Sequence, residues 1–264
     1  MGADGRKSIF ITGAASGIGL AAAKRFSQEG WFVGLADIDT TGLKLAQGAL
    51  GAGNCSIHKL DVRDRPAWKK ELAAFARAAG GRMDALLNNA GIANYAFFED
   101  QTDDEVDRQI DINIKGVSNG ARAGLELLKA TPGSTLINVA SCAGLFGAPK
   151  MAVYCATKFA VRGLSEALDV EFERHGIKVR CIMPWFVDTP ILQAGSQGSN
   201  ENIADSIKSS GSEVYTVEEA ADVIWKSIQG KDLHHLVGKA GKRLQFAARF
   251  MPGSVRKQLK SMLR

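Results

Sequence analysis

Features that commonly direct a functional assignment are missing from this sequence. The four cysteines, Cys55, Cys142, Cys155 and Cys181, have no metal-ligand spacing, so no metal site is expected. There is no signal peptide and no run of about twenty apolar residues, so we expect neither secretion nor a membrane-spanning helix. No nucleic-acid recognition module is present either. The reducing cytoplasm is the simplest location for such a chain.

The length and composition predict one α/β domain. The 264 residues, of which 45% are hydrophobic, can bury one sizeable core. Segments typical of buried strands alternate with helical patterns. This alternation predicts a doubly wound parallel sheet of about seven strands, with helices on both faces and a ligand site at the carboxyl ends of the strands. The expected strands cover residues 7–12, 31–36, 54–60, 84–88, 134–140, 177–183 and 233–237.

A glycine-rich turn follows the first expected strand. The segments KSIFIT, GAASGIG and LAAAKRFSQEG predict a strand, a turn, and a helix with small residues against the sheet. Gly13, Gly17 and Gly19 let the backbone turn tightly and approach a pyrophosphate. The N-terminus of the following helix can bind that group through its free N–H groups and its dipole. A glycine turn alone is a weak signal, but the strand and helix around it are the context that this function requires.

Tyr154, Lys158 and Ser141 have the chemistry of a proton-transfer site. In a helix over residues 151–174, Tyr154 and Lys158 project from the same face, one turn apart. The pKa of a phenol is near 10, and a nearby ammonium should lower it towards the working range. Ser141 ends an expected strand and could donate a hydrogen bond to the oxygen whose charge changes. A Tyr and a Lys four residues apart also occur by chance on many helices, so this pair alone does not establish catalysis.

Five motifs follow one another along the chain. They are Thr12-Gly13-x-x-x-Gly17-x-Gly19, Asn88-Asn89-Ala90-Gly91, Asn113 within INIKG, Ser141, and Tyr154-x-x-x-Lys158. With these motifs in this order, the chain resembles the short-chain dehydrogenase/reductase family, in its compact single-domain subgroup, over nearly its whole length. The resemblance implies one Rossmann-like, NAD-binding catalytic domain over residues 1–264.

The resemblance also implies a mechanism, which is reversible hydride transfer between an alcohol carbon and a nicotinamide ring. Tyr154 would be the general acid or base, and Lys158 would lower its pKa and hold the ribose hydroxyls. Ser141 would position the substrate oxygen, and Asn113 would anchor a water that relays protons. Asn113 could instead bend an expected long helix over residues 103–130 through its own backbone contacts.

A carboxylate after the second expected strand indicates which nicotinamide cofactor the chain prefers. The carboxylate of Asp37 can accept hydrogen bonds from both hydroxyls of an adenosine ribose and would repel a 2′-phosphate. Family members that prefer NADP usually have Arg or Lys at the positions of Ile38 or Ser16, so NAD(H) is expected in preference to NADP(H). Asp61, followed by Val62, resembles the family's adenine contact, although Asp is common at strand ends. The cofactor-binding residues implied by the resemblance are Gly13, Ser16, Gly17, Ile18, Gly19, Asp37, Ile38, Asp61, Val62, Asn89, Ala90, Gly91, Tyr154, Lys158, Pro184, Val187 and Thr189.

The sequence departs from the family after the sixth expected strand, where Pro184 is followed by Trp185 instead of the usual Gly. Thr189 still occupies the position expected to hold the nicotinamide carboxamide, and Val187 could contribute backbone groups. Trp185 could crowd the nicotinamide or form an aromatic wall for the substrate. Apolar residues in loops near the carboxyl edge predict a mostly apolar substrate pocket. They are Tyr95, Phe146, Trp185, Phe186, Ile191 and Leu192.

Residues 194–215 are rich in Gly, Ser and Asn and lie where the family has its substrate loop. A mobile lid is expected, although the composition fits an ordinary solvated loop equally well. Thr216 and Glu219 then form the pattern of a capping box, which predicts that a helix starts there.

Basic residues are concentrated at the C-terminus. Residues 231–264 contain nine Lys or Arg and one Asp and carry +8, whereas residues 1–230 carry −3. A basic amphipathic helix in the extension 239–264 could rest on an anionic membrane. Its apolar stripe could instead pack on the substrate loop or on a subunit interface. The apolar positions at helical spacing are Leu244, Ala247, Ala248 and Met251, widened by Phe246 and Phe250.

These observations predict an NAD(H)-dependent dehydrogenase or reductase that interconverts an apolar or bulky secondary alcohol and its ketone. The alternative is a catalytically minor NAD-binding protein that acts in recruitment at a membrane or partner. That role would permit loss of Tyr154 or Lys158, and both are present. By resemblance, the helices around 103–130 and 151–175 should pair in a homodimer or homotetramer.

Overall fold

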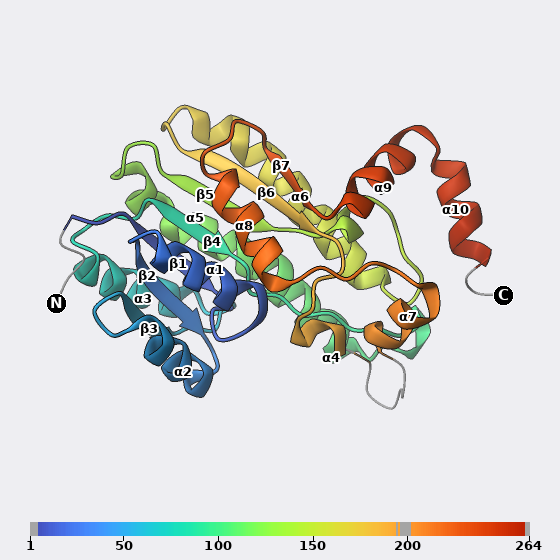
Figure 1. Ribbon diagram of the computed structural model, residues 1–264, viewed down its shortest axis with the longest axis horizontal. Helices are drawn as coiled ribbons and strands as arrows, with labels where there is room; N and C mark the ends of the chain where they lie inside the picture. Colours follow the sequence, from blue (N-terminus) through green and yellow to red (C-terminus); the bar gives the residue numbers. More distant parts are fainter. Residues whose placement is uncertain (1–4, 194, 196–201, 262–264) are drawn as a thin grey trace.

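Seven parallel strands form one sheet at the centre of the molecule (Figure 1). A computed structural model describes residues 5–193, 195 and 202–261. The strands are β1 Ser8–Thr12, β2 Phe32–Asp37, β3 Cys55–Lys59, β4 Ala85–Asn88, β5 Thr135–Val139, β6 Lys178–Pro184 and β7 His234–Val237. Their order across the sheet is β3-β2-β1-β4-β5-β6-β7, and each neighbouring pair is parallel. The predicted fold class is therefore confirmed, and the strands lie within one residue of their expected bounds.

Helices cover both faces of this sheet (Figure 1). The α-helices of the described residues are α1 Gly17–Gln28, α2 Thr40–Leu50, α3 Arg65–Ala78, α4 Asp103–Ile110, α5 Gly116–Lys129, α6 Ala152–Glu173, α7 Ile203–Ser210, α8 Val217–Ser227, α9 Lys239–Phe250 and α10 Pro252–Ser261, of which six cover the two faces. Shorter helical turns in the described residues are η1 Phe98–Asp100, η2 Asp111–Lys115, η3 Cys142–Gly144 and η4 Pro190–Gln193.

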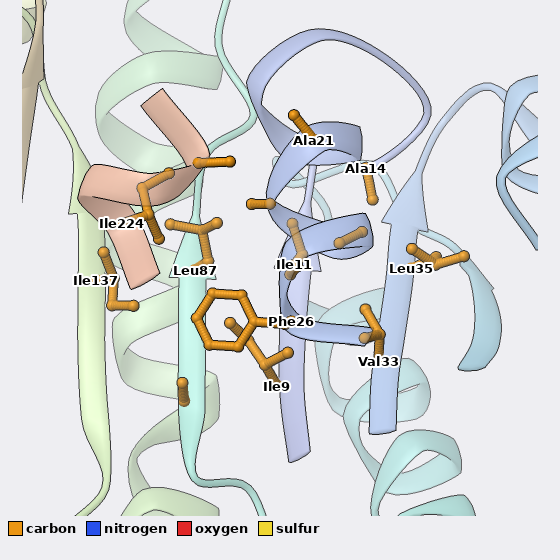
Figure 2. Close-up of a cluster of buried hydrophobic side chains, with 14 of the residues drawn as sticks. Ile9, Ile11, Ala14, Ala21, Phe26, Val33, Leu35, Leu87, Ile137 and Ile224 are labelled. Carbon is orange, nitrogen blue, oxygen red and sulfur yellow. The ribbon is translucent and has the colours of Figure 1, made fainter. Parts of the chain in front are cut away.

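One face of the sheet is covered by α1, α2 and α8. Ile9 and Ile11, two positions apart in β1, point to this face because side chains alternate along a strand. They belong to one buried cluster with Phe26 of α1 and Ile224 of α8 (Figure 2). The small side chain of Ala22, also fully buried, lets α1 approach the strands closely. The glycine turn before α1 is therefore fixed at the carboxyl end of β1.

The opposite face is covered by α3, α5 and α6. Phe10 of β1 points to this face, where its ring meets Phe75 of α3 edge-on at a centroid distance of 5.2 Å. Gly34 of β2 leaves room for both rings, since a Cβ there would lie 2.6 Å from the Phe75 ring. Burial on both faces explains why central strands such as β1 and β4 are mostly apolar.

The strand order also fixes the place of the ligand crevice. After β1 the chain continues into α1 on one face, whereas after β4 it continues into α4 and α5, which lead to the opposite face. The two connections diverge, so a crevice opens at the carboxyl ends of β1 and β4.

The long helix expected over residues 103–130 contains a π-helical turn. α4 ends at Ile110, a π-helical turn covers Asp111–Lys115, and α5 begins at Gly116. A π turn contains more residues than an α turn and commonly marks a functional position. The expected helix is therefore confirmed over Asp103–Lys129. The π turn inside it was not predicted, because the polar–apolar pattern does not reveal that Asn113 bonds to a neighbouring segment.

The segment expected as a substrate loop, 194–215, contains the helix α7. Ile203 and Ile207 of α7 are buried against Leu192, and Asn202 caps the helix by accepting a hydrogen bond from the Asp205 N–H at 2.9 Å. Apolar burial and this cap outweigh the low helix propensity of the Ser-rich segment. The part of the predicted lid at residues 194 and 196–201 lies outside the described residues.

The capping box predicted before α8 is confirmed. Thr216 Oγ1 accepts a hydrogen bond from the Glu219 N–H at 3.1 Å, and Glu219 Oε2 accepts one from the Thr216 N–H at 2.8 Å. This reciprocal pair satisfies two N–H groups that the helix cannot bond internally.

Candidate active site

The turn between β1 and α1 requires glycine at three positions. Gly13 and Gly17 have φ angles of 68° and 52°, which glycine adopts without strain. A Cβ at Gly19 would lie 2.1 Å from the carbonyl oxygen of Gly13. Because no side chain intervenes, α1 begins directly against the turn, and its first N–H groups face the crevice. An anionic phosphate group fits such a helix N-terminus.

Thr12 and Asn89 join this turn to the end of β4. The Thr12 Oγ1 accepts hydrogen bonds from the N–H groups of Asn89 at 3.0 Å and Ala90 at 3.1 Å. In return, the Asn89 side-chain amide donates to the Thr12 carbonyl at 2.9 Å. Both walls of the crevice are therefore held at a fixed separation.

Asp37 places a carboxylate beside the glycine turn. Its Oδ2 accepts a hydrogen bond from the Ala15 N–H at 3.1 Å, and its Oδ1 accepts one from the Asp39 N–H at 3.0 Å. A carboxylate oxygen can accept more than one hydrogen bond, so both remain able to bind ribose hydroxyls. Ile38 beside it is 61% exposed and offers no positive charge.

Ser141 and Tyr154 meet where η3 faces the start of α6. Ser141 Oγ accepts a hydrogen bond from the Ala143 N–H at 3.1 Å. Burial raises the pKa of the Tyr154 phenol to about 12, and a hydrogen bond with Ser141 acts in the opposite direction. The expected lowering of this pKa is therefore wrong for this structure, because burial outweighs the stabilisation of the phenolate.

Lys158 lies under the same site and is 4% exposed. Its Nζ donates a hydrogen bond to the Val139 carbonyl at 3.0 Å and lies 5.5 Å from the centroid of the Tyr154 ring. Burial lowers the pKa of Lys158 to about 8. The ammonium and the phenol are neighbours, as the four-residue spacing predicted, and each is disfavoured in its charged form by burial.

Asn113 lies behind Lys158 in the π turn and is fully buried. Its amide nitrogen donates to the Ile92 carbonyl at 2.8 Å and to Thr157 Oγ1 at 3.1 Å, while its oxygen accepts from the Ile92 N–H at 2.9 Å. A Cβ on Gly91 would lie 3.2 Å from this oxygen and 3.5 Å from Lys158 Nζ. Asn113 therefore fixes the segment that separates it from the cavity.

A cavity of about 830 Å³ connects these groups. Most of the predicted site residues line it, as do residues that the sequence patterns did not indicate. The predicted lining residues are Gly13, Ser16, Gly17, Ile18, Asp37, Ile38, Asp61, Val62, Asn89, Ala90, Gly91, Ser141, Phe146, Tyr154, Lys158, Pro184, Trp185, Phe186, Val187, Thr189, Ile191 and Leu192. Additional lining residues include Arg63, Ile92, Ala93, Arg108, Ile112, Met151 and Ile203.

Comparison with known proteins agrees with this geometry. Residues 7–200 match the family described as short chain dehydrogenase. The chain belongs to the short-chain dehydrogenase family. It is 35% identical over 218 residues to oxidoreductase UcpA of Escherichia coli K12, with 82% of each chain covered. It is 37% identical over 188 residues to 2,5-dichloro-2,5-cyclohexadiene-1,4-diol dehydrogenase LinX of Sphingobium indicum, which covers 70% of this chain and 74% of LinX.

A solved structure extends the comparison to three dimensions. A short-chain dehydrogenase/reductase from Burkholderia phymatum, crystallised in complex with NAD, superposes with a TM-score of 0.84 at 25% sequence identity. The match covers 96% of this chain and 95% of the Burkholderia chain. This family member therefore has the Rossmann-like fold that its motifs predicted.

Trp185, at the position where the family usually has Gly, lines the cavity and meets the Phe186 ring edge-on at 5.0 Å. Its backbone N–H bonds the Val237 carbonyl at 3.2 Å. The indole Nε1 is buried and has no hydrogen-bond partner in the described part of the chain. The aromatic-wall interpretation of Trp185 is consistent with this position.

Tyr95 does not line the cavity, although the sequence predicted it there. It packs behind the wall against a cluster that includes Leu192 and Ile203, and Lys150 Nζ lies 5.6 Å from its ring centroid. The position predicted for Tyr95 differs from the observed one because its ring is packed within this cluster and not against the cavity. Gly19 also lies outside the cavity lining. Its role is to let α1 approach the backbone of Gly13 closely.

Asp61 forms an ion pair with Arg63, whose Nε and Nη2 donate to the two carboxylate oxygens at 3.0 and 2.7 Å. This pairing holds the pKa of Asp61 below its usual range. Arg63 and Arg108 add positive charge to the cavity lining near Asp61 and Val62, where the sequence analysis predicted no basic residue. The adenine contact of Asp61 stays a prediction.

Cys142 and Cys155, next to the catalytic candidates, are both buried free thiols. Burial raises the pKa of Cys142 to about 12, so the thiol stays protonated and unreactive. Among residues 5–193, 195 and 202–261, no group of three or more His, Cys, Asp or Glu side chains could hold a metal ion. No helix in the same ranges is long and apolar enough to cross a membrane.

Proposed function

We propose that this family member is an NAD(H)-dependent oxidoreductase that interconverts a secondary alcohol and a ketone. The observation that carries the proposal is that Ser141, Tyr154 and Lys158 share one cavity with the glycine turn and Asp37. A proton-transfer group and a dinucleotide cradle that open into one space have the chemistry of this reaction.

The proton would move at the Tyr154 hydroxyl. When bound, the nicotinamide ring would donate a hydride to the carbonyl carbon or accept one from the alcohol carbon. In reduction, Tyr154 donates its proton to the substrate oxygen as negative charge develops there, and in oxidation the phenolate accepts that proton. Ser141 supplies a second hydrogen bond to the same oxygen. The Lys158 ammonium stabilises the phenolate that remains after reduction, and it is charged below pH of about 8.

The cofactor proposed is NAD(H) in preference to NADP(H). Gly13, Gly17 and the N-terminus of α1 offer N–H groups to the pyrophosphate. The carboxylate of Asp37, which two backbone N–H groups already hold in place, can accept hydrogen bonds from the adenosine ribose. A 2′-phosphate beside it would meet a like charge, and the neighbouring Ile38 supplies no cation to offset it.

An apolar or bulky alcohol is the substrate that the cavity fits. Its apolar side includes Met151, Trp185, Phe186, Leu192 and Ile203. The name of LinX, a relative at 37% identity, describes a dehydrogenase of a chlorinated cyclic diol. Both observations support a substrate with a ring or a long apolar part.

Two copies of the chain are proposed to pair through the helices around 103–130 and 151–175, which are α4 with α5, and α6, together with the turn η1 before α4. Phe98, Phe159 and Val170 are 65%, 43% and 74% exposed, which is costly for large apolar side chains in water. An apolar hollow of about 320 Å³ lies between Phe98 and the start of α6. Light scattering at micromolar concentration should give at least the mass of a dimer, and a purely monomeric mass would exclude this pairing.

The experiment that tests the proposed function is a screen of secondary alcohols and ketones of increasing size, followed by NADH absorbance. Turnover should rise from small to bulky apolar substrates. Binding of NADH without turnover of any member of the series would favour the alternative, a cofactor-binding protein that acts in recruitment.

A further inference from the structure

The two C-terminal helices form an arm that stands out from the body of the molecule (Figure 1). This C-terminal arm, Lys239–Ser261, consists of α9 and α10. It is attached at its base, where the Lys239 N–H bonds the Tyr215 hydroxyl at 3.0 Å and Gly241 is buried against Cys142. Gly241 is the one buried residue of α9, and α10 has none.

The charge of the arm has one sign. Its sequence contains seven Lys or Arg and no Asp or Glu. In the described part of the chain, no salt bridge joins any of these cations to a carboxylate. The cations are Lys239, Lys242, Arg243, Arg249, Arg256, Lys257 and Lys260.

Large apolar side chains lie among these cations. Phe246, Phe250 and Met251 are 59%, 64% and 48% exposed. The two rings are 4.9 Å apart, and the Arg249 guanidinium lies 5.8 Å from the Phe250 centroid. Helical periodicity places Lys242, Phe246, Arg249 and Phe250 on one side of α9. Phe246 and Phe250, which were expected to widen the apolar stripe of this helix, therefore share the exposed side of α9 with the cations.

We propose that the C-terminal arm binds the surface of an anionic lipid bilayer. Aromatic rings interleaved with cations match the boundary between headgroups and acyl chains, where rings lie in the apolar zone and Lys or Arg reach the phosphates. Each cation near an anionic surface contributes about 1 kcal/mol of attraction. A contact between the arms of two copies would bring like charges together, so it is less favourable.

The base of the arm connects this surface to the cavity. Gly241 packs against Cys142, and Cys142 lines the cavity beside Ser141. An arm bound to a bilayer would hold this side of the cavity close to the lipid. This step rests on the proposed function, because it matters only if the substrate is an apolar alcohol or ketone that partitions into the bilayer.

Vesicle sedimentation with the full chain tests the proposal without any turnover. Vesicles of phosphatidylglycerol and phosphatidylcholine should pellet the protein at about 0.1 M salt and release most of it at about 1 M, where charges are screened within a few ångströms. Vesicles of phosphatidylcholine alone should bind it at least about ten-fold more weakly.

Two sets of substitutions separate the contribution of the cations to vesicle binding from that of the aromatic rings. Lys242→Gln with Arg243→Gln and Arg249→Gln should weaken anionic vesicle binding by about ten-fold or more, and Phe246→Ala with Phe250→Ala should weaken it at every salt concentration. The matched controls change exposed residues of the body and should bind like the wild type. They are the triple variant Lys24→Gln, Lys44→Gln, Lys69→Gln and the single variant Leu45→Ala, at a position 73% exposed.

NADH affinity of each variant reports whether the body is folded and cofactor-competent. The proposal is overturned if the wild type fails to pellet with anionic vesicles at low salt, or if the arm variants and the body controls bind equally. It is also overturned if the arm variants lose dimer mass in light scattering without a change in vesicle binding, since the arm would then dock on a second copy. If the protein binds vesicles but turns over no substrate, the result would support lipid binding by the C-terminal arm and contradict the proposed function.

Discussion

The glycine-turn side of the cavity and its aromatic side are built by different means. The glycine-turn side, formed by Gly13, Gly17 and Asp37, depends on backbone conformation and on hydrogen bonds to backbone N–H groups. The aromatic side, formed by Phe146, Trp185 and Phe186, depends on the size of side chains. The first side tolerates few substitutions and suits a ligand that does not vary. The second can change with the substrate while the fold stays the same.

The largest effect should come from Tyr154→Phe, which removes the transferable proton where the two sides meet. Turnover should fall by about 10²- to 10⁴-fold, whereas NADH affinity should stay within about two-fold because the glycine-turn side is untouched. Steady-state kinetics and NADH fluorescence titration measure the two quantities. Tyr95→Phe, outside the cavity, is the matched control and should retain activity. If Tyr154→Phe keeps more than a few per cent of wild-type turnover, Tyr154 is not the group that transfers the proton.

The next effect concerns Lys158, whose pKa burial lowers from 10.5 to about 8. Between these two pH values the unfolded chain binds more protons than the folded chain, so the contribution of Lys158 to the free energy of unfolding rises with pH across that window. Lys158→Met removes the titration. The wild-type free energy of unfolding, minus that of the variant, should therefore increase by about 3 kcal/mol from pH 8 to 10.5. Urea denaturation at several pH values measures this difference. A difference that stays constant with pH would show that burial does not lower the pKa of Lys158.

The glycine-turn side can be tested with one methyl group. Gly19→Ala places a Cβ against the Gly13 carbonyl oxygen, so α1 must shift and NADH affinity should fall by about 10- to 100-fold. Gly48→Ala in α2, where a Cβ would meet nothing within 4 Å, should bind NADH like the wild type. Equal affinity of the two variants would contradict the importance of this close approach.

Asp37, on the glycine-turn side, is expected to set the preference between NAD(H) and NADP(H). Wild-type catalytic efficiency should be higher with NAD(H) than with NADP(H). Asp37→Ser with Ile38→Arg removes the like charge and adds a phosphate partner, so the ratio of efficiencies should shift towards NADP(H) by about ten-fold or more. Equal use of both cofactors by the wild type would refute the argument from Asp37.

The smallest effect should come from the aromatic side. Trp185→Ala enlarges the cavity, so the ratio of kcat/KM for bulky over small alcohols should rise by about ten-fold, with NADH affinity unchanged. Phe97→Ala, at a position 39% exposed and outside the cavity lining, should leave the ratio as it is. A loss of NADH affinity in Trp185→Ala would instead place the indole against the cofactor.

The strands and the glycine turn could be predicted because both leave local signals in the sequence. Strands buried on two faces are mostly apolar, and a turn that needs Gly13, Gly17 and Gly19 permits few other residues. The spacing of Tyr154 and Lys158 likewise transfers directly to a helix face.

The features that could not be predicted depend on partners distant in the chain. The π turn at Asp111–Lys115 accompanies a hydrogen bond from Asn113 to Ile92, and α7 exists because Ile203 and Ile207 pack on Leu192. Tyr95 packs in the same cluster and is absent from the cavity lining, which no local pattern indicates. The raised pKa of Tyr154 follows from burial that no local pattern records.

The packing of α1 against α8 has a consequence for synthesis of the chain (Figure 2). Trp225 of α8 meets the Phe26 ring edge-on at 5.1 Å, and Arg25 pairs with Asp222 at 2.8 Å. A ribosome that has made only the first two hundred residues has released most of the sheet, but α8 is still absent from this face. The nascent polypeptide then exposes Phe26 and its apolar neighbours, which is the state most open to aggregation or chaperone binding.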